Sequence, residues 1–186
     1  MKVVTIAISC FCMMSGTAVG AQAVFGPALQ GVCTYGRNAA LAGSAAGRGA
    51  SLRLQQLQTG INADLAPQRQ ALVQEQSRLQ ALSSRPTPQL QADFTALQGR
   101  VQAFSQLEQA RNAQLQQARV NAEAQIGRVT DQAAAQLVTA RRCSILLDRA
   151  TTFGSNQAMY ITPDVVRETD RVLPTITVVL PSATNK

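Results

Sequence analysis

The feature that most constrains this chain is a stretch at residues 51–142 in which apolar side chains recur with the period of an α-helix. From Leu90 onward they are about 3.6 residues apart, with Arg111 as one polar interruption. The repeat of this second arm comprises Phe94, Leu97, Val101, Phe104, Leu107, Leu115, Ala118, Ala122, Ile126, Val129, Ala133, Leu137 and Ala140, and that of the first arm comprises Leu54, Leu57, Ile61, Leu65, Leu72, Leu79 and Leu82. Each arm therefore has one narrow apolar stripe, which suffices to pack a single partner helix.

The two arms are separated at residues 83–88 by the sequence Ser-Ser-Arg-Pro-Thr-Pro. Proline cannot continue a helix, and hydroxyl side chains cap helix ends, so this segment predicts the tip of a long antiparallel hairpin. At 1.5 Å per residue the second arm is roughly 75–80 Å long. Pro67 removes one backbone hydrogen bond from the first arm, so we expect a kink at residues 62–66. A plain solvated coiled coil is the simplest interpretation, and two helices cannot enclose a pocket.

Residues 1–23 have the three parts of a secretory signal peptide. Lys2 supplies the positive start, residues 3–14 are apolar, and Ala21-Gln22-Ala23 is a small-x-small cleavage site. The apolar run is too short to span a membrane. Cys10 and Cys12 raise the alternative of a lipoprotein, but neither follows a Leu-x-small pattern. The sequence therefore predicts export to the periplasm with cleavage near Ala23.

Export would leave two cysteines, Cys33 and Cys143, one just before the hairpin and one just after it. In an oxidising compartment such a pair is a candidate disulfide. Two buried, reduced thiols are the alternative.

Residues 24–50 and 143–186 flank the hairpin and form a predicted small body that contains β-strands. Its expected elements are a strand at 30–35, a weak Ala-rich helix at 37–50, strands at 143–148 and 149–153 with a turn at 154–156, a helix with Thr162 as N-cap that ends before Pro174, and an extended run at 175–180. A body of about 70 residues has too small a core to be stable without disulfides or oligomerisation. We therefore expect it to oligomerise through Val32, Tyr35, Ile145, Leu146, Leu147, Val165 and Val166.

The composition argues against an enzyme. The chain has no histidine, which removes imidazole acid–base catalysis, Ser-His and Cys-His pairs and the common zinc motifs. No glycine-rich phosphate loop follows a strand, and the acidic residues are spread singly along the chain. The sequence therefore predicts no catalytic residue, no cofactor site and no metal site.

The formal net charge of +7 comes almost entirely from arginine. A basic chain first suggests nucleic acid, but these arginines are dispersed and lack stacking aromatic neighbours. Nucleic acid is therefore not the expected partner. Anionic periplasmic partners, such as acidic unfolded chains, lipopolysaccharide or an anionic membrane surface, fit an exported chain better.

The order of parts resembles the Skp/OmpH-like periplasmic chaperones: signal peptide, short strand, helical hairpin, short strands and a closing helix. The resemblance is sharpest at Ile145-Leu146-Leu147-Asp148, a hydrophobic strand ending in Asp, and at Ile161-Thr162-Pro163-Asp164-Val165-Val166, the start of the last helix. Tyr160 departs from the family pattern, which usually has Asp there. The resemblance covers about residues 30–173 and leaves 175–186 outside it.

The resemblance implies a mostly α fold in which a hairpin tentacle stands on a small β-containing trimerisation body. It also implies an ATP-independent holdase that binds unfolded outer-membrane proteins between the helical arms of a homotrimer. Two alternatives stay open at this point: a basic coiled-coil protein that binds lipopolysaccharide or peptidoglycan, and a periplasmic adaptor or scaffold.

Overall fold

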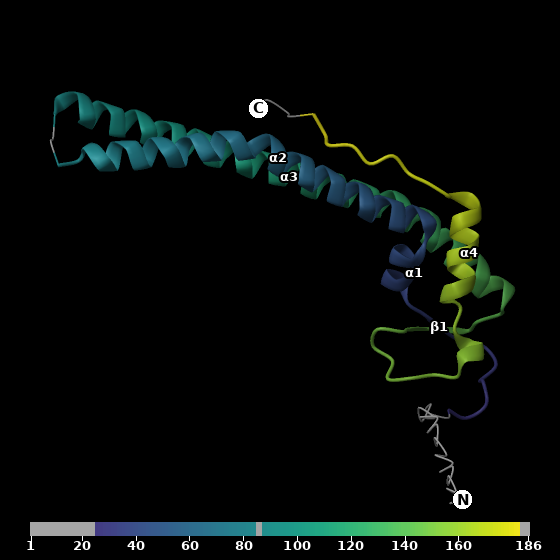
Figure 1. Ribbon diagram of the computed structural model, residues 1–186. Helices are drawn as coiled ribbons and strands as arrows, with labels where there is room; N and C mark the ends of the chain where they lie inside the picture. Colours follow the sequence, from purple (N-terminus) through teal and green to yellow (C-terminus); the bar gives the residue numbers. More distant parts are fainter. Residues whose placement is uncertain (1–24, 85–86, 183–186) are drawn as a thin grey trace, which may run out of the picture.

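The chain forms a small body from which a long helical hairpin projects (Figure 1). The computed structural model describes residues 25–84 and 87–182, so the predicted signal peptide lies outside the described residues. Helix α2 (Ala45–Leu82) and helix α3 (Pro88–Ala140) run antiparallel and contain 38 and 53 residues. The predicted fold class, a mostly α chain with a small β-containing body and a long hairpin, is confirmed.

At the tip of the hairpin, a threonine cap and a proline begin helix α3, as the sequence indicates. The Thr87 hydroxyl caps α3 by accepting a hydrogen bond from the Leu90 amide at 3.1 Å. Pro88 occupies the first position of the helix, where no amide hydrogen is needed. Helix α2 ends at Leu82, so the arms end where the sequence indicates.

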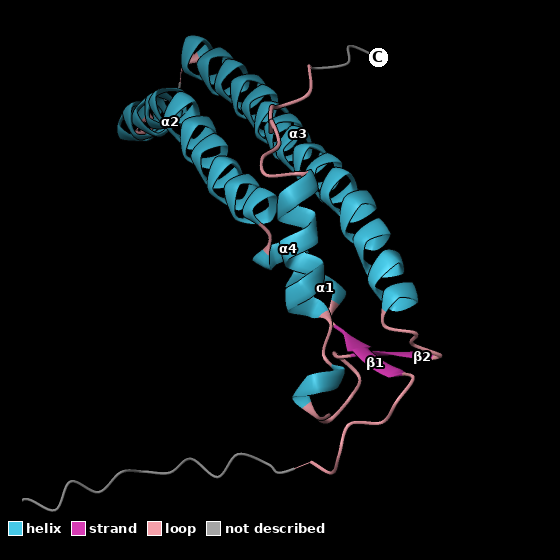
Figure 2. Cartoon of the chain, turned by 90° about the vertical axis from the view of Figure 1, so that its right-hand side faces the viewer, coloured by secondary structure: helices cyan, strands magenta, loops and turns pink. Residues whose placement is uncertain are grey.

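In the outer part of the hairpin, large apolar side chains of the two stripes pack against each other. The buried cluster between the arms comprises Ile61, Leu65, Leu72, Leu79, Leu90, Leu97, Phe104 and Leu115. An ion pair between Arg69 and Glu108, at 2.5 Å, links the arms outside this cluster. Helix α2 continues through Pro67 without a break, and it changes direction along its length (Figure 2).

Residues 37–50 are helical as predicted, except that the helix is interrupted at Ser44, where two helices meet. Helix α1 (Arg37–Gly43) ends at Ser44, and α2 begins at Ala45 rather than at residue 51. The Ser44 hydroxyl accepts from the Gly47 amide at 3.0 Å and donates to the Leu41 carbonyl at 2.9 Å, which caps one helix and closes the other. A Cβ at Gly47 would lie 1.9 Å from the Leu41 oxygen, so only glycine fits at this junction.

A two-stranded parallel sheet lies at the base of the hairpin. Strand β1 (Val32–Tyr35) pairs with β2 (Ile145–Asp148), with Val32 opposite Ile145 and Tyr35 opposite Asp148. The two strands were expected at these places, although each is shorter than its predicted range. A disulfide joins Cys33 to Cys143 with their Cα atoms 5.7 Å apart, so β1 is linked covalently to the segment that follows α3.

The predicted second strand at residues 149–153 is wrong, because these residues form a turn. The Asp148 carboxylate accepts from the Ala150 amide at 2.8 Å, and the Asp148 carbonyl accepts from the Thr152 hydroxyl at 2.6 Å. Such local side-chain bonds compete with strand pairing. On the side of β1 away from β2, Thr34 forms an isolated parallel bridge with Tyr160 instead. Tyr160 directly follows the short 3₁₀ helix η1 (Gln157–Met159).

Helix α4 (Thr162–Val172) closes the body against the base of the hairpin. Thr162 was expected to be its N-cap, which is also wrong: Ile161 holds that position. The Thr162 hydroxyl accepts instead from the Gly36 amide at 2.8 Å, so it ties α4 to the end of β1. The buried core of the body comprises Cys33, Tyr35, Ala40, Ala133, Ala134, Ile161 and Val165.

Residues 173–182 leave α4 and run in extended form along the hairpin towards its middle (Figure 1). The extended run expected at 175–180 is present, but it pairs with no strand among the described residues. None of the described helices is both long and apolar enough to cross a bilayer.

Candidate functional site

The seven residues predicted to form the oligomerisation body differ in their exposure to solvent. Tyr35 and Val165 are buried within the core of the single chain, and Val32 and Val166 are half-buried. Ile145, Leu146 and Leu147 remain exposed, with accessible fractions between 38% and 52%. The exposed members are consecutive residues of one strand, β2.

Strand β2 is an apolar sheet edge. Its one strand partner in the described chain is β1, so its other edge has no neighbour there. A parallel sheet is normally covered on its faces, and an uncovered edge is a template for pairing with another chain. Among the seven predicted residues, those at 145–147 are therefore the ones that lie exposed on a free sheet edge of the described chain, and association through them stays a prediction.

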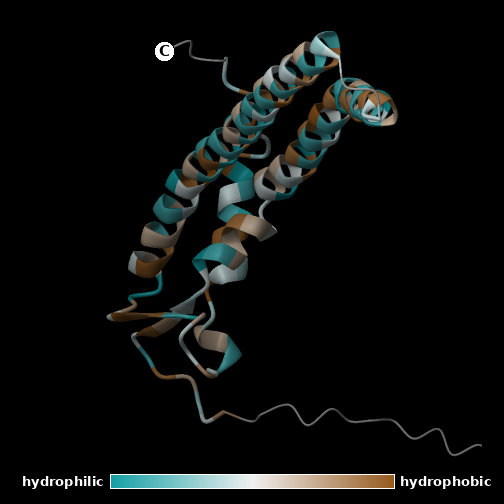
Figure 3. Cartoon of the chain, turned by 90° about the vertical axis from the view of Figure 1, so that its left-hand side faces the viewer, coloured by the Kyte–Doolittle hydropathy of each residue, from teal (hydrophilic) through white to brown (hydrophobic). Residues whose placement is uncertain are grey.

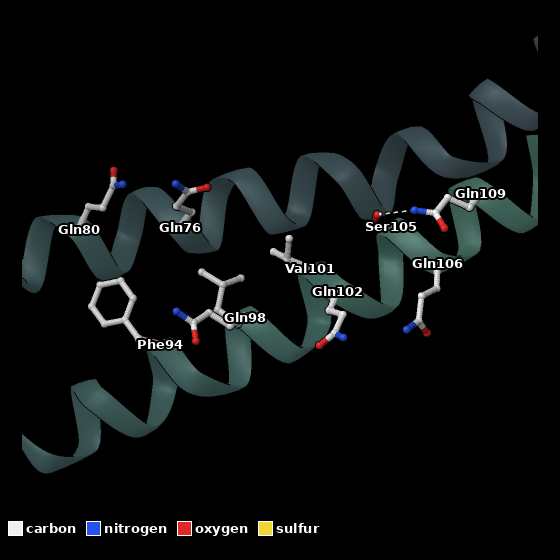
Figure 4. Close-up of a pocket in the computed structure, with 10 residues that line it drawn as sticks. Gln76, Gln80, Phe94, Gln98, Val101, Gln102, Ser105, Gln106 and Gln109 are labelled. Atoms are coloured by element: carbon white, nitrogen blue, oxygen red, sulfur yellow. Dashed lines mark hydrogen bonds between the residues drawn. The ribbon is translucent and has the colours of Figure 1, made fainter.

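A groove lies between the two arms on the tip half of the hairpin (Figure 4). It has a volume of about 690 Å³ and is open to solvent. Its apolar floor is made by Phe94, Leu97 and Val101 of α3. Its remaining lining residues are Gln76 and Gln80 of α2 and Gln98, Gln102, Ser105, Gln106 and Gln109 of α3.

The lining of this groove is uncharged, because every polar residue in it except Ser105 is a glutamine. A glutamine amide both donates and accepts hydrogen bonds, so it can satisfy a peptide group in either direction. Val101 is 46% exposed and Phe94 is half-buried, so the groove already presents apolar surface to solvent. Such a surface suits weak contact with many peptide sequences rather than recognition of one.

This groove is not among the predicted features, although the sequence has a signal for it. Glutamines follow one another at 98, 102, 106 and 109, and at 76 and 80, which is helical spacing. Each series therefore lies on one face of its helix. What the spacing did not reveal is that the packing of the arms brings the two series to the same hollow.

Charged residues on the outer faces of the arms are partly paired. Arg78 forms a bidentate contact with Glu75, and this hydrogen bond lowers the pKa of the Glu75 carboxyl below its ordinary value. Apolar and polar residues alternate along both arms (Figure 3). Because the chain has more arginines than acids, the arms carry a dispersed positive field.

Within residues 25–84 and 87–182, no three histidine, cysteine, aspartate or glutamate side chains gather into a metal-binding group. The surfaces described above are the glutamine-lined groove, the β2 edge and the faces of the long hairpin.

Comparison with known proteins gives two matches. Residues 32–169 match the family described as outer membrane protein (OmpH-like). The fold is similar to the crystal structure of a protein from Caulobacter crescentus CB15 that has been proposed to be an outer membrane chaperone (OmpH-like). The TM-score is 0.77 and the sequence identity is 28%, over 89% of this chain and 98% of that one. A comparison with curated proteins finds no match.

Proposed function

This chain belongs to the OmpH-like family, and on that premise we propose that it is a periplasmic holdase that binds unfolded outer-membrane proteins without ATP. The observation that carries the proposal is the uncharged groove of Phe94, Val101 and glutamines, on a hairpin that projects far from the body. The family match and the likeness to the Caulobacter protein support a chaperone role.

The chemistry of the groove suits an unfolded β-barrel protein. Each membrane strand of such a protein alternates apolar and polar side chains over about ten residues. The floor of Phe94 and Val101 would cover the apolar side chains, while the glutamine amides would bond to the exposed peptide groups. Each contact would be weak and reversible, which lets the client leave without an energy source.

Association through β2 would bring several hairpins around one client. Apolar edges at residues 145–147 support such an assembly, and we propose that it is a homotrimer. Linked weak sites give an avidity that can exceed the single-site affinity by about 10²–10⁴. The arginines would speed the encounter with clients whose net charge is negative. Salt screens this attraction, because the Debye length is about 8 Å at physiological ionic strength.

The test is dilution of a urea-unfolded outer-membrane barrel into buffer with or without the chain lacking residues 1–23, followed by light scattering. Val101→Asp puts a charge on the groove floor, and Val120→Asp is its matched control on the same helix, because Val120 is 55% exposed and does not line the groove. We expect the unaltered chain to suppress aggregation at stoichiometric amounts. Val101→Asp should lose at least half of this activity and Val120→Asp little of it.

Circular dichroism of both variants checks that the helices persist. Aggregation that proceeds unchanged in the presence of the unaltered chain would refute the holdase. Equal activity of the two variants would remove the groove from the mechanism.

A further inference from the structure

The segment after α4 lies against the hairpin with its side chains alternately inward and outward. Ile176 and Leu180 are half-buried, and Val178 between them is only 5% exposed. Thr177 and Val179 point away, and Val179 is 62% exposed. The segment therefore has the side-chain pattern of a β-strand, although it pairs with no strand in the described chain.

The surface beneath this segment is built by both arms. Val178 packs in a cluster with Ala46 and Ala50 of α2 and with Ala118, Ala122 and Ile126 of α3. Leu180 packs against this cluster and also against the leucine cluster of the outer hairpin. The alanines leave room for a backbone to lie close to the helices, so they form a shallow apolar seat (the alanine seat, Ala46, Ala50, Ala118 and Ala122).

The polar contacts at this seat are made to the backbone of the segment. Arg53 Nε of α2 donates to the Val178 carbonyl at 3.4 Å, and Gln114 Nε2 of α3 donates to the Pro181 carbonyl at 3.0 Å. A carbonyl is present in every residue, so these contacts do not depend on which side chains the segment carries. The segment from 173 to 182 contains no charged residue. The seat thus recognises an extended backbone with apolar side chains at alternate positions.

We propose that the alanine seat is a binding site for extended peptide segments of alternating apolar pattern, and that residues 173–181 occupy it in cis until a client segment displaces them. The proposal rests on the proposed function, because the membrane strands of an unfolded barrel have this pattern and a length of about 9–11 residues. The family match ends at residue 169, before the occupying segment begins.

Occupation in cis sets a threshold for client binding. A segment tethered by a short linker competes at an effective concentration on the order of millimolar. One weak client segment therefore does not displace it, whereas an unfolded barrel with many such segments does. The segment would keep the apolar seat covered between clients and would leave it when an unfolded chain is held.

The test uses the chain lacking residues 1–23 and a fluorescent peptide with the sequence of residues 173–186, followed by anisotropy. Val178→Asp releases the inward side chain, and Val179→Asp is the matched control because it changes the outward neighbour. We expect Val178→Asp to bind the peptide at least 10-fold more tightly than the unaltered chain or Val179→Asp. A peptide of the same composition with its apolar residues grouped together should bind at least 10-fold more weakly.

The seat itself is tested in the Val178→Asp background. Gln114→Ala removes a donor to the peptide backbone and should weaken peptide binding several-fold, whereas Gln117→Ala on the exposed face of the same helix should not. Val178→Ser is the second releasing variant if aspartate disturbs the helical signal. Equal peptide binding by the released and control variants, or equal binding of the grouped peptide, overturns the proposal.

The peptide assay contains no client, so its result is independent of the holdase assay. In the latter, Val178→Asp should halve aggregation at a lower chain concentration than Val179→Asp requires. If Val178→Asp binds the peptide tightly but needs as much chain as Val179→Asp to halve aggregation, clients do not displace the segment. Loss of peptide binding with holding intact would overturn the seat and leave the proposed function standing.

Discussion

At the scale of single residues, Tyr35 shows how the body tolerates a buried polar group. Its ring lies in the body core, and its hydroxyl has no hydrogen-bond partner among the described residues. Burial, and then the nearby Asp131 carboxylate, raise the pKa of the Tyr35 phenol to about 12, while Arg37 acts in the opposite direction. Arg37 also binds Asp131 through two hydrogen bonds of 2.8 Å, so this carboxylate is held at the junction of α1 and α3.

Tyr35→Phe should therefore change how stability depends on pH. The unfolded phenol ionises near 10.0 and the folded one near 12, so the stabilising contribution is complete below pH 10 and is lost as pH rises towards 12. Relative to the Phe variant, the unaltered chain should lose on the order of 1–2 kcal/mol by pH 11.5, less than two full pKa units because nearby solvent screens part of the effect. Urea unfolding of both proteins at pH 8 and pH 11.5 measures this, and parallel losses would contradict it. At pH 8 the Phe variant should be at least as stable, since it removes an unpartnered hydroxyl.

At the scale of elements, the disulfide holds together the two ends of the hairpin. Cys33 lies in β1 and Cys143 lies between α3 and β2, with 110 residues of sequence separation that include both arms. The bond therefore keeps β1 joined to the end of α3 when the arms move. In the chain-entropy model, closing a loop of this length contributes about 4–5 kcal/mol through the unfolded state.

Replacement of both cysteines by serine should lower the free energy of unfolding of the body by several kcal/mol. The helices of the outer hairpin should remain, because their leucine cluster lies away from the sheet. Denaturant unfolding separates the two parts when it is followed by circular dichroism for the helices and by tyrosine fluorescence for the body, because Tyr35 and Tyr160, the two tyrosines of the chain, both lie in the body. Thiol titration of the oxidised, denatured chain without residues 1–23 is the control, and two free thiols instead of none would contradict the bond in solution.

For the whole molecule, the proposed assembly depends on the β2 edge, which has no neighbour in the described chain. A two-stranded sheet is marginal alone, and its apolar edge residues would be buried by a second copy. The hairpin core, in contrast, is complete within one chain. The arms should therefore keep their packing whether or not the bodies associate.

Leu146→Asp should reduce the assembly to a smaller species. A charge on this edge would have to be desolvated on pairing, which costs far more than the apolar contact contributes. Val73→Asp is the control, because Val73 is also exposed but lies on an arm. Light scattering coupled to size exclusion gives both masses. A monomeric unaltered chain, or a Leu146→Asp variant of unchanged mass, would show that this edge is not the interface.

Elements whose signals are local can be predicted from the amino-acid sequence without knowledge of the fold. Apolar residues at helical spacing produce the two arms, Thr87 and Pro88 start the second one, and valine, tyrosine and isoleucine mark the two strands. Each of these signals lies within a few residues of the structure that it specifies, so it can be read without knowing the fold. The family motifs at residues 145–148 and 161–166 belong to the same class.

Other features depend on contacts between residues that are distant in the sequence, so they follow only from how the chain packs. Helix α2 begins at Ala45 because Ser44 turns the chain there and because Asp170 of α4 accepts from the Ala45 amide at 2.6 Å. Thr162 binds the Gly36 amide rather than its own helix because β1 ends beside it. Val178 lies buried only because two arms, more than fifty residues away along the chain, bring small side chains to one surface. A sequence pattern specifies which side chains share a face, but the contact that buries that face depends on how elements far apart in the chain pack together.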